Sequence, residues 1–74
     1  GDDKSVKAAV SEFDTVIKKY PKSDKSKEAS LKLGFAYLLQ NKNADAKIQF
    51  KKVIKQYPGT SVAKLAEARL AQLS

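Results

Sequence analysis

Apolar residues recur at intervals of three and four along most of this chain, which is the spacing of one face of an α-helix. Turn-forming residues interrupt the spacing three times, at Pro21, at residues 41–43 and at Pro58-Gly59. The pattern predicts four helices, over about residues 5–20, 23–40, 43–57 and 60–73. We therefore expect an all-α fold in which consecutive helices pack as antiparallel neighbours.

The second predicted helix carries apolar residues on two faces. At about 100° per residue, the two faces hold Ala29, Leu33, Ala36 and Tyr37 on one side, and Leu31, Phe35, Leu38 and Leu39 on the other. Such a helix needs a neighbour on each side. Gly34 costs roughly 1 kcal/mol of helix propensity relative to alanine. We expect that it permits close approach of the third helix, with Ala46 as the small residue across the contact.

Two segments of the chain repeat each other. The sequence FDTVIKKYP at 13–21 matches FKKVIKQYP at 50–58 at Phe, Val, Ile, Lys, Tyr and Pro, and Ala9 matches Ala46 at the same 37-residue offset. In both copies we expect the tyrosine to close the core of a helical hairpin and the proline to end the helix. The chain then divides into the second half of one repeat (1–21), one complete repeat (22–58) and a C-terminal capping helix (59–74).

Short polar residues mark the predicted helix ends. Ser23 or Asp24 can cap the second helix, and Thr60 the fourth. Asn41 tolerates the left-handed conformation that stops a helix, so we expect it to end the second helix. Asn43 is expected to cap the third helix.

The composition excludes several kinds of chemistry. The chain has no cysteine and no histidine, so it lacks disulfides, thiol chemistry and the common zinc ligands. Its carboxylates are scattered and its three glycines stand alone, so the sequence offers neither a catalytic pair nor a phosphate loop. We expect no enzymatic activity, no cofactor and no metal site.

The charge favours acidic partners. Fifteen Lys and Arg residues against eight Asp and Glu residues give a formal net charge of +7. The third helix turns four lysines outward, Lys47, Lys51, Lys52 and Lys55. No aromatic residue is expected on this outward face to stack on a base, so we expect a solvated face and no nucleic-acid partner. A module that binds nucleic acid or another polyanion is kept as the alternative.

Residues 27–58 resemble a tetratricopeptide repeat. The residues at its characteristic positions are Leu33, Gly34, Tyr37, Ala46, Phe50, Val53 and Pro58. Ser30 stands where the repeat usually has tryptophan, so we expect that contact to be weaker or absent. The resemblance implies a fragment of an α-α superhelix that acts as a scaffold for protein–protein interaction.

In such arrays the first helix of each hairpin lines a groove for a partner. The resemblance therefore implies a groove formed by Glu28, Leu31, Lys32, Phe35, Leu38, Leu39, Leu65, Ala68, Arg69 and Gln72. An apolar floor with a charged rim suits an amphipathic helix or an extended peptide. For Leu31 and Leu38, burial against the fourth helix is the alternative.

The run YPGTSVAKLAEARL, from Tyr57 to Leu70, carries a more specific resemblance. Together with the preceding repeat it is similar to the C-terminal tetratricopeptide domain of the CpoB/YbgF family of periplasmic Tol-Pal-associated proteins. The resemblance implies a periplasmic adaptor that binds TolA, with a peptidoglycan synthase as a further partner. Its implied role is to coordinate outer-membrane constriction with septal peptidoglycan synthesis in cell division.

Two further expectations concern the membrane and self-association. The longest apolar run, Phe35 to Leu39, is too short to span a bilayer, so we expect no membrane insertion, and any signal peptide lies outside this fragment. The missing first half of the first repeat would leave an apolar face on the first helix. A truncated or engineered fragment that forms a homo-oligomer through this face is therefore another alternative.

Overall fold

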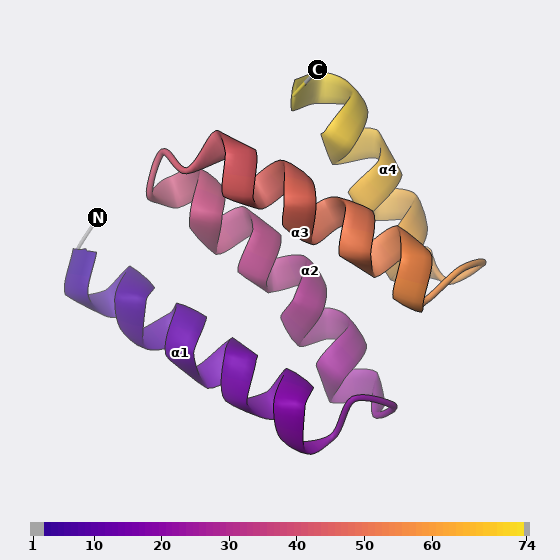
Figure 1. Ribbon diagram of the computed structural model, residues 1–74, viewed down its shortest axis with the longest axis horizontal. Coiled ribbons are helices and arrows are strands. Elements are labelled where there is room, and N and C mark those ends of the chain that lie inside the picture. The colour runs from indigo at the N-terminus through magenta and orange to yellow at the C-terminus, as the bar shows by residue number, and fades with distance from the viewer. Residues whose placement is uncertain (1–2, 74) are drawn as a thin grey trace.

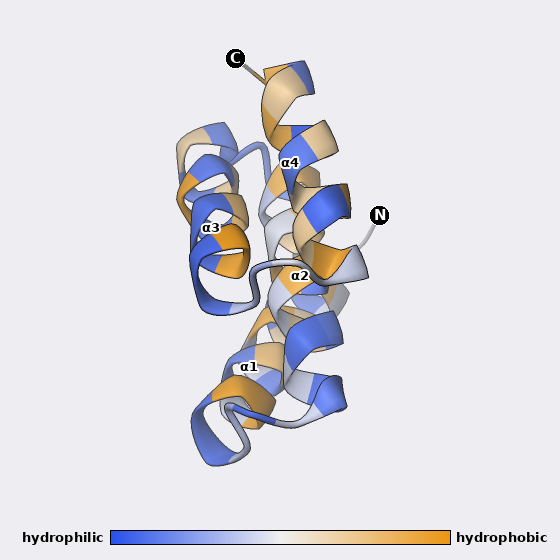
Figure 2. Cartoon of the chain, turned by 90° about the vertical axis from the view of Figure 1, so that its right-hand side faces the viewer, coloured by the Kyte–Doolittle hydropathy of each residue, from blue (hydrophilic) through white to orange (hydrophobic). Residues whose placement is uncertain are grey.

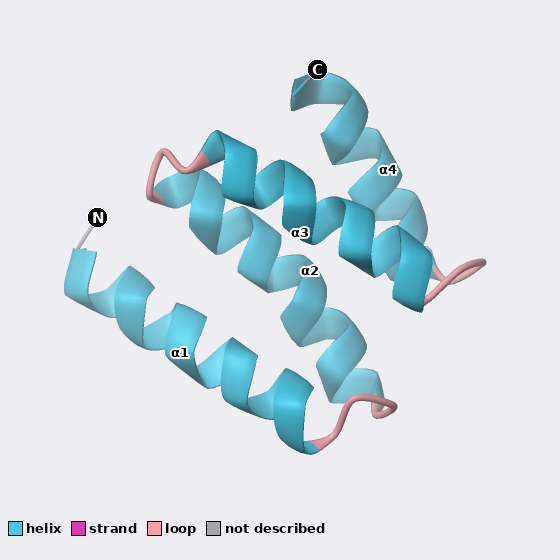
Figure 3. Ribbon diagram, viewed as in Figure 1, coloured by secondary structure: helices cyan, strands magenta, loops and turns pink. Residues whose placement is uncertain are grey.

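The chain folds into four α-helices joined by short turns (Figure 1 and Figure 3). The computed structural model describes residues 3–73. Its helices are α1 (Asp3–Lys19), α2 (Asp24–Leu39), α3 (Asn43–Gln56) and α4 (Ser61–Leu73). The described residues contain no strand, so the expected all-α fold is confirmed.

The helices pack in chain order into a flat body of 33 × 31 × 15 Å. Each helix packs against the next, and α2 also contacts α4. Figure 1 shows α2 between α1 and α3, and Figure 2 shows α3 and α4 on opposite sides of the body. Within the described residues, α2 thus has three helical neighbours, whereas α1 has only α2.

Both apolar faces of α2 have helical neighbours, as its sequence predicted, although Leu39 at the end of the helix stays exposed. On the side of α1, Ala29, Leu33 and Ala36 are each at most 5% exposed. The hydroxyl of Ser26 lies 3.0 Å from the backbone carbonyl of Val16 on α1, within hydrogen-bond distance. On the other side, Leu31 is buried in the core with α3 and α4.

The core lies between α2, α3 and α4. Its buried members are Leu31, Ala46, Phe50, Val53, Tyr57, Val62 and Ala66. Phe50 and Val53 are the largest hydrophobic side chains with no exposed surface. Leu70 and Leu73 of α4 pack against this cluster while staying half-buried. The apolar side of α4 therefore faces the core that it shares with α2 and α3.

Gly34 lets the ring of Phe50 lie directly against the backbone of α2. A Cβ atom at residue 34 would lie 2.8 Å from Cδ1 of Phe50, closer than such atoms approach in proteins. The side chain nearest to Gly34 is therefore that of Phe50, which the sequence did not single out for this contact. Ala46 is fully buried about one helical turn away, and the longer phenyl group is what reaches the gap.

Ser30 occupies the position where the repeat usually has tryptophan, and it is 1% exposed. The side-chain Nε2 of Gln49 donates a hydrogen bond of 3.0 Å to the backbone carbonyl of Ser30. The Ser30 hydroxyl has no hydrogen-bond partner among the described residues. An interhelical hydrogen bond thus stands where a large ring would otherwise make apolar contact.

Ser23 and Thr60 cap α2 and α4 in the same way, as expected. The Ser23 hydroxyl accepts from the backbone N–H of Ser26 at 3.1 Å, and the Thr60 hydroxyl accepts from that of Ala63 at 3.2 Å. Each hydroxyl also donates to the carbonyl of a tyrosine three residues earlier. The two turns are therefore structural as well as sequence repeats.

Asn41 ends α2 in the left-handed conformation, with φ of 59°. Its N–H donates to the carbonyl of Leu38, and the N–H of Lys42 donates to that of Tyr37, which is the hydrogen-bond pattern of a Schellman turn. This tight turn brings the chain directly into α3. Asn43 is therefore the first helical residue, and the cap position falls on Lys42, which makes no side-chain cap bond. The expectation that Asn43 caps α3 was wrong.

The two tyrosine-proline pairs end their helices as predicted, but their tyrosines differ. Tyr57 is 8% exposed, and its hydroxyl donates a hydrogen bond of 3.0 Å to the carbonyl of Pro21. Tyr20 is 63% exposed. The expectation that both tyrosines close a hairpin core was wrong for Tyr20, because no described helix packs on that side of α1.

Candidate partner-binding surface

The predicted groove residues on α2 and α4 meet at Phe35. The guanidinium carbon of Arg69 lies 5.3 Å from the centroid of the Phe35 ring, within the range of a cation–π interaction. On its other side, Phe35 makes an edge-to-face contact with Phe50, with centroids 5.6 Å apart. The side chain of Arg69 also donates to Oε1 of Gln72 at 3.3 Å. Phe35 is therefore half-buried, held between the core and a surface arginine.

Two predicted groove residues are large apolar side chains with most of their surface exposed. Leu39 is 72% exposed at the end of α2, and Leu65 is 54% exposed on α4. Leu39 lines a hollow together with Phe35 and Lys32. These side chains present apolar surface that the described residues do not cover, which is the kind of surface that a partner can bury.

The remaining predicted groove residues divide by burial. Leu31 is 7% exposed and belongs to the core, and Leu38 is half-buried and packs against that core. The alternative of burial against α4 therefore describes Leu31, which offers a partner little surface. Glu28 and Ala68 are exposed, on α2 and α4 respectively.

The lysines of α3 form a separate surface. Lys51, Lys52 and Lys55 are exposed, and Lys47 is half-buried. Two ion pairs are found among the described residues, Lys18 with Asp14 and Lys27 with Asp24, and neither involves α3. Within the described residues, no carboxylate therefore forms a direct ion pair with the lysines of α3.

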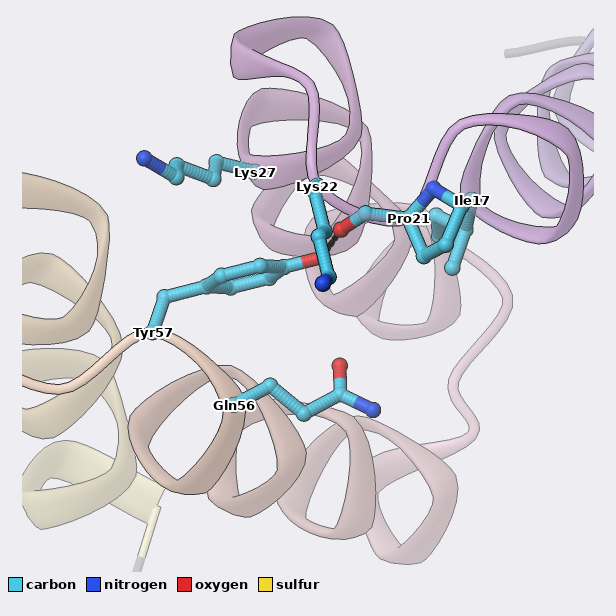
Figure 4. Close-up of a pocket in the computed structure, with 6 residues that line it drawn as sticks. All are labelled: Ile17, Pro21, Lys22, Lys27, Gln56 and Tyr57. Carbon is cyan, nitrogen blue, oxygen red and sulfur yellow. Dashed lines mark hydrogen bonds between the residues drawn. The ribbon is translucent and has the colours of Figure 1, made fainter.

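A hollow that the sequence did not predict lies where the α1–α2 turn meets the end of α3. Its volume is about 350 Å³, and it is lined by Ile17, Pro21, Lys22, Lys27, Gln56 and Tyr57. Figure 4 shows the ring of Tyr57 reaching across it towards the carbonyl of Pro21. The repeated tyrosine-proline pair was a signal for this junction, but only the packing shows that residues 36 positions apart join there.

The described residues offer no group of histidine, cysteine or carboxylate side chains arranged to hold a metal ion. None of the described helices has both the length and the apolar character needed to cross a bilayer.

Comparison with known families identifies a tetratricopeptide repeat in residues 28–60. The matched span covers α2 from Glu28, all of α3 and the turn to Thr60, and it contains five of the seven buried residues of the core. No curated protein matches the chain. Tetratricopeptide repeats are typically non-enzymatic scaffolds for protein–protein interaction. The chain therefore carries a helical repeat of an interaction type.

Proposed function

We propose that this protein binds a segment of another protein across α2 and α4 and has no enzymatic activity of its own. The observation that carries the proposal is the arrangement around Phe35, where an aromatic ring and Arg69 meet beside exposed apolar side chains. The tetratricopeptide repeat in residues 28–60 supports it. Aromatic residues, phenylalanine included, and arginine are enriched at protein–protein interfaces.

The charge of the chain indicates the chemistry of the partner. A formal net charge of +7 favours a partner segment with acidic side chains, and attraction of this kind speeds association at low salt. Burial of the exposed Leu39 and Leu65 in a complex requires apolar side chains opposite them. An acidic amphipathic segment satisfies both requirements.

More specifically, we propose that the protein is a periplasmic adaptor of the Tol-Pal system. TolA is the proposed partner, with a peptidoglycan synthase as a second, and the proposed role is to coordinate outer-membrane constriction with septal peptidoglycan synthesis. The support is the resemblance of the run from Tyr57 to Leu70 to the CpoB/YbgF family. The periplasm is accordingly the proposed location.

Titration of the chain with a TolA domain tests this form. Replacing Arg69 by Gln removes the cation above Phe35 and should weaken binding by about 1–2 kcal/mol, or about five- to thirty-fold. The matched control is Lys51→Gln, which removes the same charge from an exposed position on α3 outside the predicted groove. Equal effects of the two substitutions, or no binding at all, would contradict the adaptor proposal.

The exposed lysines of α3 favour a second candidate, a module that binds nucleic acid or another polyanion. In that case, Lys51→Gln should reduce affinity for a random-sequence oligonucleotide, and the affinity should fall steeply with salt. The adaptor proposal predicts tighter binding to the TolA domain than to the oligonucleotide at physiological salt. Equal affinity that collapses with salt would favour the polyanion module.

A further inference from the structure

An apolar hollow lies between α1 and α2, and it shares Lys32, Phe35 and Leu39 with the predicted groove. Its volume is about 300 Å³, and it is lined by Ser5, Val6, Ala9, Phe13, Lys32, Phe35, Ala36 and Leu39. Six of these eight residues are hydrophobic, and Lys32 is the only charged one. The hollow therefore suits an apolar surface with little charge.

The internal repeat shows what kind of element covers such a surface. Ala46 and Phe50 of α3 are 0% exposed because α2 lies on them, whereas the equivalent Ala9 and Phe13 of α1 are only half-buried. A neighbouring pair of equivalent residues shows the same difference in burial. Gln49 of α3 is 8% exposed and donates a hydrogen bond to α2, while the equivalent Glu12 of α1 is exposed. The surface of α1 that is left open thus corresponds to the surface of α3 that α2 covers.

The contacts of α2 define what a covering helix must contain. Gly34 admits the ring of Phe50, and the next residue, Phe35, lies under the cation of Arg69. At the 37-residue offset, Phe50 corresponds to Phe13 and Arg69 corresponds to Lys32. Both Phe13 and Lys32 line the hollow. A helix placed on α1 as α2 is placed on α3 therefore needs glycine opposite Phe13 and then an aromatic residue beneath Lys32.

A second copy of this chain does not supply such a helix. The equivalent of α2 within the chain is α4, and it carries Ala71 and Gln72 where α2 carries Gly34 and Phe35. If α4 packed on α1 as α2 packs on α3, Ala71 would take the place of Gly34. Its Cβ would then clash with the phenylalanine ring, as a Cβ at Gly34 would clash with Phe50. Gln72 would take the place of Phe35, and it has no aromatic ring to lie beneath Lys32. This mismatch disfavours head-to-tail association of copies through α4.

We propose that the α1–α2 hollow binds one amphipathic helix of another polypeptide segment that carries a glycine followed by an aromatic residue on its apolar face. The bound helix occupies the position on α1 that α2 occupies on α3. The inference rests on the internal repeat and not on the identity of TolA. The site shares Lys32, Phe35 and Leu39 with the predicted groove, and residues of α1 form the rest of it together with Ala36.

The chain's own sequence supplies the probe. A labelled peptide of residues 22–42 contains the α2 sequence with its Gly34-Phe35 pair, and a peptide of residues 60–74 contains the α4 sequence. Fluorescence anisotropy should show that the first peptide binds the 74-residue chain and that the second binds at least about tenfold more weakly. Gly34→Ala in the first peptide should weaken its binding by a similar factor, because the added methyl group meets the Phe13 ring.

Variants of the chain locate the binding site. Phe13→Ala should weaken binding of the α2 peptide, and Val6→Lys should do the same by placing a charge in the hollow without removing a core ring. Ile48→Ala is the matched control, because Ile48 is an exposed apolar residue of α3 that lines neither the hollow nor the predicted groove, and it should leave binding unchanged. Circular dichroism should show the same helical signal for Val6→Lys and Ile48→Ala.

Three results would overturn the inference. The first is equal binding of the two peptides, which would indicate association through α4. The second is unchanged binding to both Phe13→Ala and Val6→Lys, which would mean that the peptide displaces the chain's own α2 from α3. The third is no binding of the α2 peptide. The two proposals can fail separately. If TolA binding is lost in Arg69→Gln but kept in Val6→Lys, the proposed function stands even when the α2 peptide fails to bind the hollow.

Discussion

Helices α1 and α3 end in nearly the same sequence, yet they are buried to very different extents. Phe50 and Val53 of α3 have no exposed surface, whereas the equivalent Phe13 and Val16 of α1 are half-buried. The difference lies in the neighbours, because α3 packs against α2 and α4 while α1, among the described helices, packs only against α2. The same apolar pattern thus forms a core in one place and an open surface in the other.

The tyrosines at the helix ends sharpen this comparison. Tyr57 reaches the carbonyl of Pro21 and ties the end of α3 to the α1–α2 turn. Tyr20 has no equivalent turn before it within the described residues, and its ring is exposed. A tyrosine-proline pair in this fold therefore joins one hairpin to the preceding one, and its first copy is left without that junction.

The largest expected effect is the difference between Phe50→Ala and Phe13→Ala. Phe50→Ala should lower the free energy of unfolding by about 3–5 kcal/mol, since it empties a fully buried site. Phe13→Ala should cost about 1–2 kcal/mol because that ring is only half-buried. Urea denaturation followed by circular dichroism measures both. Equal losses would show that the two helices are equally covered in solution.

Gly34→Ala should destabilise the chain by about 1–3 kcal/mol through overpacking against Phe50. Helix propensity alone predicts the opposite sign, a gain of about 1 kcal/mol. Ala71→Gly on α4 is the matched control, and it should cost about 1 kcal/mol through propensity. A stabilising Gly34→Ala in thermal denaturation would mean that the close approach of α2 and α3 is absent in solution.

Removing the Tyr57 hydroxyl by Tyr57→Phe should cost about 1 kcal/mol, because the hydrogen bond to Pro21 is lost and its carbonyl becomes unpaired there. Tyr20→Phe should change stability by only a few tenths of a kcal/mol, at most about 0.5. Chemical denaturation of the two variants under identical conditions provides the comparison. A larger loss in Tyr20→Phe would contradict the assignment of the junction to Tyr57.

The smallest expected effect concerns the turn before α3. Asn41→Gly should raise the free energy of unfolding by a few tenths of a kcal/mol, up to about 1, because residue 41 has positive φ and glycine adopts this conformation without strain. Asn43→Gly should lower it by up to about 1 kcal/mol, because residue 43 is helical and makes no cap. Melting temperatures of the two variants should shift in opposite directions, and shifts of the same sign would contradict the turn geometry.

Local patterns in the sequence were sufficient for most of the fold. The three- and four-residue spacing gave the four helices, hydroxyl residues marked the caps at Ser23 and Thr60, and Asn41 marked the left-handed turn. Each of these features depends on a few neighbouring residues. This is why a single sequence suffices to predict them.

Apart from the cap of α3, which falls on Lys42 and not on Asn43, the errors arose where distant residues meet. The side chain nearest to Gly34 is that of Phe50, which the sequence did not single out for this contact. The burial of Leu31 depends on where α4 lies, and the exposure of Tyr20 depends on which helices flank α1. The hollow between α1 and α2 could likewise be located only after these helices were placed. Sequence periodicity predicts an apolar face but does not say which neighbour covers it.

Amide hydrogen exchange of the chain tests most directly whether α1 is the incompletely covered copy of α3. The account predicts that amides around Phe50 and Val53 exchange only through global unfolding, while those around Phe13 and Val16 exchange faster through local opening of α1. The α2 peptide should then slow exchange in α1. Equal protection of the two helices in the chain alone would contradict the account.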